Sequence, residues 1–191
     1  MSTDRRTVLT LIAAALGSAA PLPAAAQSSR ITAFAFSFDG LDGTPIRLAD
    51  HAGQPIMVVN TASQCGYTPQ YAGLQTLWTR FRDRGLFMLA VPSNDFGGQE
   101  PGDAAEIAHT AHDQYHVGFP IAAKAAVRGA GQHPFYRWAA VERPLDVPRW
   151  NFHKYLIGRD GHIAASFASA VEPTDPKVLA AIGRELESRA S

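Results

Sequence analysis

Cys65 is the residue of this chain whose type and position are best suited to chemistry. It is the only cysteine, and it lies in the polar loop Ala62–Pro69, between the apolar run Pro55–Ala62 and a run of helical periodicity. A thiol just before a helix N-terminus is favoured as the thiolate, because that end of a helix carries partial positive charge. We expect Gly66 to adopt an unusual backbone conformation that turns further N–H groups toward the sulfur. A buried, inert cysteine is the commoner alternative for a free thiol, but the polar loop favours a reactive one.

Two further segments could supply neutral hydrogen-bond donors. The polar segment Val91–Pro101 follows a second predicted strand, and Trp150, Asn151 and Phe152 lead into a predicted hairpin. In an open α/β sheet, sites lie beyond the carboxyl ends of the strands. An indole N–H and primary amides would stabilise S⁻ and a developing oxyanion without adding a charge. Taken singly, these residues are more typical of a core tryptophan and of turns.

Three histidines, His109, His112 and His116, recur at i, i+3 and i+7 and can share one face of a predicted helix. Such a face can bind a metal ion, but it is more commonly the solvated side of an amphipathic helix. We find no carboxylate or thiol at a spacing that would complete the site. We therefore predict no metal and no cofactor.

The elements that must position these residues follow from hydrophobic periodicity and from turn residues. Asp103 and Glu106 have the spacing of a capping box, and Gly-rich turns separate two pairs of strands. We expect, in order, a hairpin over Ile31–Asp39 and Thr44–Leu48, a strand over Pro55–Ala62, a helix from about Pro69 to Arg84, a strand over Leu86–Val91, a helix from Asp103 to about Tyr115, a short helix over His133–Ala140, a hairpin over Phe152–Ile157 and His162–Phe167, and a helix from Pro176 to about Arg189. This order predicts an α/β protein with a central mixed β-sheet flanked by helices and an N-terminal β-hairpin.

Composition excludes several classes of protein, and the N-terminus predicts export. The 191 residues carry 17 basic and 17 acidic side chains and are 46% hydrophobic, which argues against nucleic-acid binding and against intrinsic disorder. Residues 1–26 combine Arg5 and Arg6, an apolar run too short to span a membrane, and an Ala-x-Ala cleavage site ending at Ala26. We expect a signal peptide of the twin-arginine type, with an ordinary Sec signal as the alternative. The mature protein is then a periplasmic single domain over residues 27–191, without membrane attachment.

Three ordered segments together resemble the glutathione peroxidase family. They are Val58–Leu74 around the cysteine, Asn94–Gly102, and Trp150–Leu156 followed by an Arg-Asp-Gly turn. The resemblance covers nearly all of the predicted mature chain and implies a thioredoxin-like fold. It also implies that Cys65 is the peroxidatic residue of a catalytic tetrad completed by Gln99, Trp150 and Asn151.

The resemblance further implies a chemical cycle. The thiolate attacks the O–O bond of hydrogen peroxide or an organic hydroperoxide, water or an alcohol leaves, and Cys65 becomes a sulfenic acid. A thiol condenses with the sulfenic acid, and a second thiol resolves the mixed disulfide.

The chain also departs from the pattern of many cysteine-type members of this family, which carry a resolving cysteine. The corresponding positions hold Ser93 and Ala111, so the reductant must be external: glutathione, another small thiol or a protein dithiol. The short segment before Trp150 favours a monomer by resemblance. The alternative to a peroxidase is a non-catalytic thioredoxin-fold redox sensor or docking protein that uses the single thiol.

Overall fold

The computed structural model describes residues 31–188. The signal peptide predicted for residues 1–26 lies outside the described residues, as do the first residues of the domain predicted to begin at residue 27. Within the described range, no helix has the length and apolar character needed to cross a membrane.

The centre of the molecule is a four-stranded mixed sheet, as predicted. Its strands are β3 (Ile56–Thr61), β4 (Phe87–Pro92), β5 (Lys154–Ile157) and β6 (Ile163–Phe167), in the order β4-β3-β5-β6. β3 and β4 are parallel, whereas β5 pairs antiparallel with both β3 and β6. The sheet is therefore built from one crossover connection and one hairpin.

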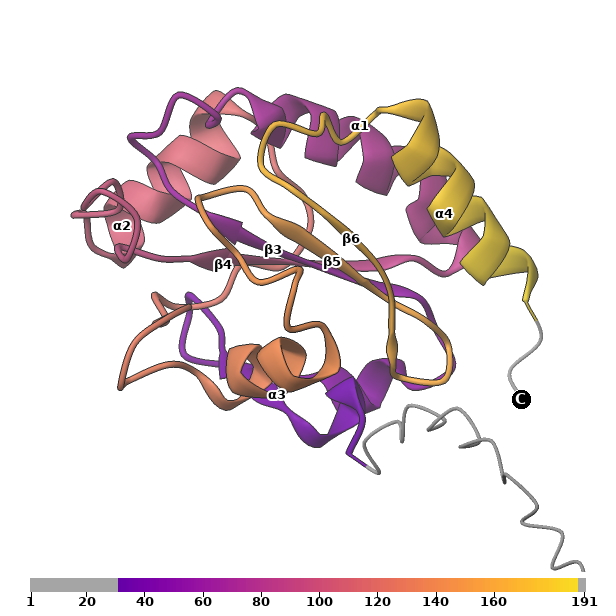
Figure 1. Cartoon of the computed structure of the whole chain (residues 1–191). Helices are drawn as coiled ribbons and strands as arrows, with labels where there is room; N and C mark the ends of the chain where they lie inside the picture. Colours follow the sequence, from indigo (N-terminus) through magenta and orange to yellow (C-terminus); the bar gives the residue numbers. More distant parts are fainter. Residues whose placement is uncertain (1–30, 189–191) are drawn as a thin grey trace, which may run out of the picture.

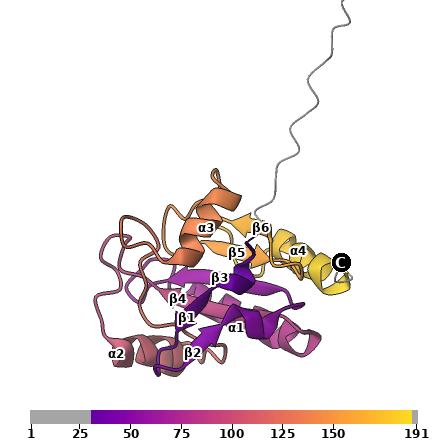
Figure 2. The same cartoon turned by 90° about the horizontal axis from the view of Figure 1, so that it is seen from below.

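The predicted N-terminal hairpin is present but shorter than expected. It consists of β1 (Ser37–Asp39) and β2 (Pro45–Arg47), and its flanks Ala33–Ala35 and Leu48–His51 form 3₁₀ turns. Both flanks bury an apolar side chain in the core, so packing overrides the strand pattern there. Figure 2 shows the hairpin on the β4 side of the molecule, away from β6.

Helices cover both faces of the sheet (Figure 1). α1 (Gln70–Phe81) and α4 (Pro176–Glu187) lie on one face, and α3 (Pro134–Glu142) lies on the other with the N-terminal segment. A 3₁₀ turn extends α1 to Arg84 and ends at Gly85, whose φ of 101° is in the left-handed region that glycine favours. α4 begins at Pro176, the first-turn position in which proline is well tolerated.

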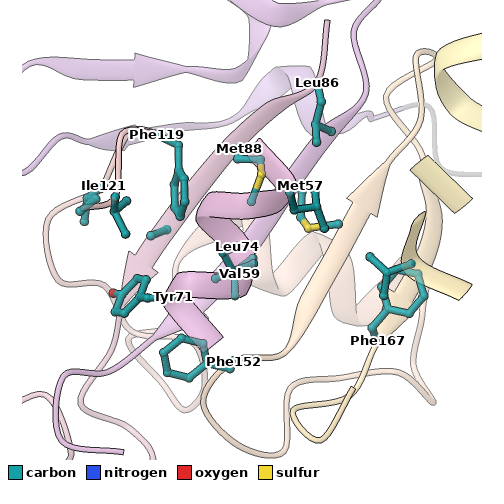
Figure 3. Packing of buried hydrophobic residues seen from close by; sticks show 14 of the residues in the cluster. Met57, Val59, Tyr71, Leu74, Leu86, Met88, Phe119, Ile121, Phe152 and Phe167 are labelled. Atoms are coloured by element: carbon teal, nitrogen blue, oxygen red, sulfur yellow. The ribbon is translucent and has the colours of Figure 1, made fainter. Parts of the chain in front are cut away.

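Two apolar layers hold the helices against the sheet. Met57 and Val59 of β3 belong to the layer beneath α1 and α4, and Ile56 and Val58 belong to the layer beneath α3. This alternation is the period of two expected for a strand buried on both faces. Figure 3 shows the first layer, in which Tyr71 and Leu74 of α1 pack over β3 and β4.

The helix predicted from Asp103 is only partly α-helical. Its capping box is confirmed: Asp103 Oδ1 accepts from Glu106 N at 3.1 Å, and Glu106 Oε2 accepts from Asp103 N at 3.0 Å. α2 (Ala104–Ala108) then widens into a π-helical segment, His109–Gln114. π-helical turns are rare and are frequent near functional sites.

Candidate active site

Three segments meet at one edge of the sheet because of the directions of the strands. β3 and β4 are parallel and end at the same edge, and the antiparallel β5 begins there. The loop after β3 carries Cys65, the loop after β4 carries Gln99, and the turn before β5 carries Trp150 and Asn151. The strand order therefore places all four predicted site residues on segments that converge.

The Cys65 thiol is buried, with 7% exposure, and it accepts a hydrogen bond from the main chain. Tyr67 N donates to Sγ at 3.4 Å. This backbone N–H fixes the position of the sulfur within the turn. The prediction that N–H groups turn toward the sulfur is confirmed by this contact. The expected cause is wrong, because Gly66 is not among the residues with positive φ.

The hydroxyl of Thr68 fixes the conformation of this turn. Thr68 Oγ1 accepts from Cys65 N at 3.0 Å and lies 2.7 Å from Cys65 O and 2.9 Å from Ala62 O, to which it can donate. Thr68 is buried, so this hydroxyl satisfies polar main-chain groups that water does not reach. The turn is therefore closed by its own side chain before α1 begins.

The turn Trp150–Phe152 is held against the end of β3 by one buried asparagine. Asn60 Nδ2 donates to Trp150 O at 3.0 Å, and Phe152 N donates to Asn60 O at 2.6 Å. Phe152 has a φ of 63°, a left-handed conformation that a bulky residue rarely adopts. Lys154 Nζ donates to Phe152 O at 2.8 Å and supports this strained position.

Lys154 is fully buried, and its ammonium group donates hydrogen bonds to three oxygen atoms. Besides Phe152 O, Nζ donates to Gln70 Oε1 and to Val171 O, each at 2.7 Å. Burial lowers the pKa of Lys154 to about 8, while Glu172 acts in the opposite direction. The lysine thereby ties β5 to the start of α1 and to the loop before α4.

The adjoining His153 is buried as well. Burial and the charge of Lys154 lower the pKa of His153 to about 4, so at neutral pH the imidazole is uncharged.

The glycine turn after β4 makes room for the Trp150 ring. Gly97 and Gly98 have φ values of 70° and 63°, which only glycine adopts without strain. A Cβ on Gly97 would lie 3.2 Å from Trp150 Cη2 and 3.5 Å from Gln99 Cγ. The indole also packs beside the Phe96 ring, at a centroid distance of 6.1 Å, and remains 38% exposed.

The two predicted amides form a pair. Asn151 Nδ2 donates to Gln99 Oε1 at 3.0 Å and Asn151 is fully buried. Because Gln99 accepts through its oxygen, its Nε2 group points its N–H bonds elsewhere, and no hydrogen bond of the described residues uses them. Gln64 N donates to Gln99 O at 3.0 Å, which joins this pair to the residue before Cys65.

The structure thus brings Gln99, Trp150 and Asn151 together and ties Gln99 to the cysteine loop. In the described part of the chain, the hydrogen bonds place none of these three side chains on Sγ itself.

Glu100, next to Gln99, is a buried carboxyl that the sequence analysis passed over. It is 1% exposed, and burial raises its pKa, with Ser63 and Lys124 acting in the opposite direction. Ser63 lies close enough to favour the charged form. Yet neither Glu100 Oε2 nor Ser63 Oγ has a hydrogen bond of ordinary geometry.

The histidines of the α2 region have partners of their own. His109 Nδ1 lies 2.9 Å from Asp113 Oδ2, and His112 Nδ1 lies 2.8 Å from Val117 O. Asp113 follows His109 by one turn and pairs with that histidine alone. Among the described residues, no group of three or more His, Cys, Asp or Glu side chains is placed to hold a metal ion.

The two positions at which the family resemblance suggests a further cysteine face the core. Ser93 and Ala111 are both fully buried, and Cys65 is a free thiol. Ala111 lies in the π-helical segment and packs in the layer beneath α1.

Comparison with solved structures first defines a thioredoxin-fold protein. A thiol:disulfide interchange protein of the thioredoxin family from Chlorobium tepidum superposes with a TM-score of 0.62 over 84% of this chain and 99% of its own, at 14% identity. The crystal structure titled "Trgpx in apo form" superposes with a TM-score of 0.70 over 85% of this chain and all of its own, at 30% identity. The predicted thioredoxin-like fold is confirmed.

Sequence comparison then gives the family. The profile described as "Glutathione peroxidase" matches residues 33–140. The "Hydroperoxy fatty acid reductase gpx1" of Synechocystis sp. is 40% identical over 153 residues, which cover 75% of this chain and 90% of that protein. The "Glutathione peroxidase-like peroxiredoxin gpx1" of Schizosaccharomyces pombe is 40% identical over 135 residues, 69% of this chain and 85% of that protein. The chain belongs to the glutathione peroxidase family, and it is an oxidoreductase that acts on peroxides with thiols as reductants.

The sequence analysis missed three residues that build the site: Asn60, Thr68 and Lys154. Asn60 and Lys154 are polar residues inside otherwise apolar strand segments, and that conflict of pattern was the available signal. Thr68 carried no comparable signal, because a threonine before a helix is ordinary.

Proposed function

We propose that Cys65 is the peroxidatic residue and that Gln99, Trp150 and Asn151 supply the donors that assist it. The Cys65 thiolate attacks one oxygen of the peroxide, an S–O bond forms as the O–O bond breaks, and the second oxygen leaves as water or an alcohol after taking up a proton. The observation that carries this assignment is the Asn151–Gln99 amide pair, which Gln64 joins to the cysteine loop.

Each donor has a role that follows from its position. The free Nε2 group of Gln99 and the indole N–H of Trp150, an exposed residue, are neutral donors for the peroxide and the leaving oxygen. Asn151 acts by holding Gln99 through its oxygen, so that the Gln99 amide presents N–H bonds rather than its carbonyl. Neutral donors stabilise developing negative charge and leave the thiolate without a competing cation.

The reductant is a second molecule, because Cys65 has no cysteine partner in the chain. A thiol attacks the sulfenic acid, water leaves, and a mixed disulfide forms; a further thiol then releases Cys65. The peroxide is hydrogen peroxide or an organic hydroperoxide. The "Hydroperoxy fatty acid reductase" name of a relative supports a place for organic hydroperoxides among the substrates.

Kinetics of purified variants test this assignment. Cys65→Ser abolishes thiol-dependent peroxide consumption, whereas Gln99→Ala and Asn151→Ala lower kcat/KM for peroxide by about 10- to 100-fold, the range of positioned hydrogen-bond donors. Gln54→Ala, an exposed amide far from the site, is the matched control. Trapping of a Cys65 sulfenic acid without multiple turnover under any thiol would instead support the sensor hypothesis.

We also propose that the protein is exported by the twin-arginine route and acts in the periplasm as a monomer. The support for export is the charged, apolar and Ala-x-Ala pattern of residues 1–26. Cell fractionation of the native chain and of a variant with Arg5→Lys and Arg6→Lys tests the route, since the variant should stay in the cytoplasm. Light scattering on the processed protein tests the monomer.

A further inference from the structure

The buried ammonium group of Lys154 lies between the two halves of the candidate active site. One half is the turn Trp150–Phe152, and the other is the turn that carries Cys65 and continues into α1. Lys154 Nζ donates to Phe152 O at 2.8 Å and to Oε1 of Gln70, the first residue of α1, at 2.7 Å. A single side chain of β5 therefore contacts both halves.

Hydrogen bonds continue from Gln70 to the sulfur. Gln70 N donates to Tyr67 O at 2.8 Å, and Tyr67 N donates to Cys65 Sγ at 3.4 Å. The Gln70 side chain is itself fixed, because it is buried and its Nε2 donates to Ser169 O at 2.8 Å. Gln70 is thus two hydrogen bonds away from the reacting atom.

On its other side, Lys154 binds a residue in a strained conformation. Phe152 has a φ of 63°, and both of its main-chain polar groups are occupied: its N–H by Asn60 O at 2.6 Å and its oxygen by Lys154. A bulky residue keeps such a conformation only where its surroundings fix it. Without the ammonium group, Phe152 can relax and displace the preceding Asn151, which holds the Gln99 amide.

The surroundings of Lys154 allow its ammonium group one orientation. The side chain is fully buried, and a third hydrogen bond goes to Val171 O at 2.7 Å. An ammonium group has three N–H bonds and here has three acceptors, so all of its donors are used. Its place between the two halves of the site is therefore defined on every side.

We infer that Lys154 is a positioning residue for the reaction of Cys65 with peroxide, in which its ammonium group holds the donors of the Trp150–Asn151 turn at a fixed place relative to the sulfur. The inference rests on the proposed function, because it assigns Lys154 a role in the oxidation of Cys65. Lys154 touches none of the reacting atoms and acts through Phe152 and Gln70.

Two reactions of the same sulfur separate this role from a general loosening of the structure. With hydrogen peroxide, an S–O bond forms, the O–O bond breaks, and the leaving oxygen needs the donors of the Trp150–Asn151 turn. With iodoacetamide, an S–C bond forms and iodide leaves, which needs no donor. Both reactions use the Cys65 thiolate, so the ratio of the peroxide to the iodoacetamide rate constant reports on the donors.

Lys154→Met should lower this ratio by about tenfold or more, since small misplacements of reacting groups cost large factors in rate. Methionine keeps an unbranched side chain without the charge. The Tyr71 and Phe152 rings, which pack edge-on at a centroid distance of 5.3 Å (Figure 3), still hold the turn on α1. Ile182→Val, which removes a buried methylene from α4, is the matched control and should lower stability without changing the ratio.

Gln70→Met tests the same bridge from the side of the cysteine turn. It leaves Lys154 on Phe152 O but removes the acceptor on α1, so the ratio should fall by about threefold. The double variant should fall no further than Lys154→Met alone, because the two residues act through one contact.

An unchanged ratio in folded Lys154→Met overturns the inference, as does a double variant in which the two losses multiply. If Lys154→Met fails to fold, Gln70→Met carries the test, and an unchanged ratio there overturns the inference. A native protein whose sulfur does not react with peroxide would instead contradict the proposed function, since the inference concerns the change in ratio between native protein and variant.

Discussion

At the scale of single residues, Cys65 is positioned by short-range hydrogen bonds from its own turn. Tyr67 N reaches the sulfur, and the Thr68 hydroxyl accepts from Cys65 N. These contacts span two or three residues, so they form as soon as the turn closes. The hydrogen bonds that position the sulfur therefore come from its own turn and not from Gln99 or Asn151.

Thr68→Val tests this arrangement, because valine has the shape of threonine without its hydroxyl. The buried Cys65 N–H loses its acceptor, which should cost about 1–3 kcal/mol of unfolding free energy. A small displacement of the sulfur should also slow sulfenic acid formation by about tenfold or more. Urea unfolding and stopped-flow oxidation measure the two effects.

Thr76→Val is the control for Thr68→Val. Thr76 is an exposed threonine of α1 whose hydroxyl lies 2.9 Å from Ala72 O, so its loss should change neither quantity appreciably. Equal oxidation rates for native protein and Thr68→Val would show that the hydroxyl does not position the sulfur.

Sequence reasoning named four candidate site residues but not all of their contacts. Cys65 was recognisable as a single thiol before a helix, and Gln99, Trp150 and Asn151 from the resemblance of their segments. The hydrogen bond from Asn60 to Trp150 O joins residues that lie 90 positions apart in the sequence. Such a pairing is fixed by strand order, which local patterns do not specify.

At the scale of elements, local sequence patterns likewise predict some segments and miss others. β3 was predictable because an apolar run of strand length is typical of a buried parallel strand. The π-helical segment His109–Gln114 was not, because an α-helix and a π-helix share the same local residue preferences over one turn. The segment buries Ala111 in the core, which is a tertiary feature, and it ends where His112 Nδ1 lies 2.8 Å from Val117 O.

The buried Lys154 of β5 makes the unfolding free energy of the protein depend on pH. Its pKa is lowered from 10.5 to about 8 in the folded protein, so between pH 8 and 10.5 the unfolded chain binds more protons than the folded one. Stability contributed through Lys154 therefore rises with pH across this window. Relative to Lys154→Met, the native protein should gain about 2 kcal/mol of unfolding free energy from pH 7 to 9.5.

Denaturant unfolding of both proteins at each pH measures this difference. Comparing the two cancels the contributions of Tyr71 and Tyr155, whose pKa values are raised by burial and which both proteins share. Lys177→Met, an exposed lysine of α4, serves as the control. A difference that stays flat from pH 7 to 9.5 would mean that the Lys154 ammonium is not held in a desolvated position.

At the scale of the whole molecule, a single cysteine determines what oxidation can do to the protein. A peroxidase with a resolving cysteine protects its sulfenic acid by closing an intrachain disulfide. Here the chain has no second thiol, and the position suggested for one by resemblance holds Ala111, packed in the core. Between peroxide attack and the arrival of an external thiol, the sulfenic acid is therefore exposed to a second oxidation.

We therefore expect excess peroxide without thiol to inactivate the enzyme irreversibly. The intact mass should rise by one and then two oxygen atoms, both on the peptide that contains Cys65, with no loss of two hydrogens. A reductant added later should recover no activity. Adding a small thiol before the peroxide should prevent the gain of the second oxygen, because condensation to the mixed disulfide competes with it. Recovery of full activity by thiol after prolonged peroxide treatment would contradict this account and would require a means of protecting the sulfur other than a disulfide.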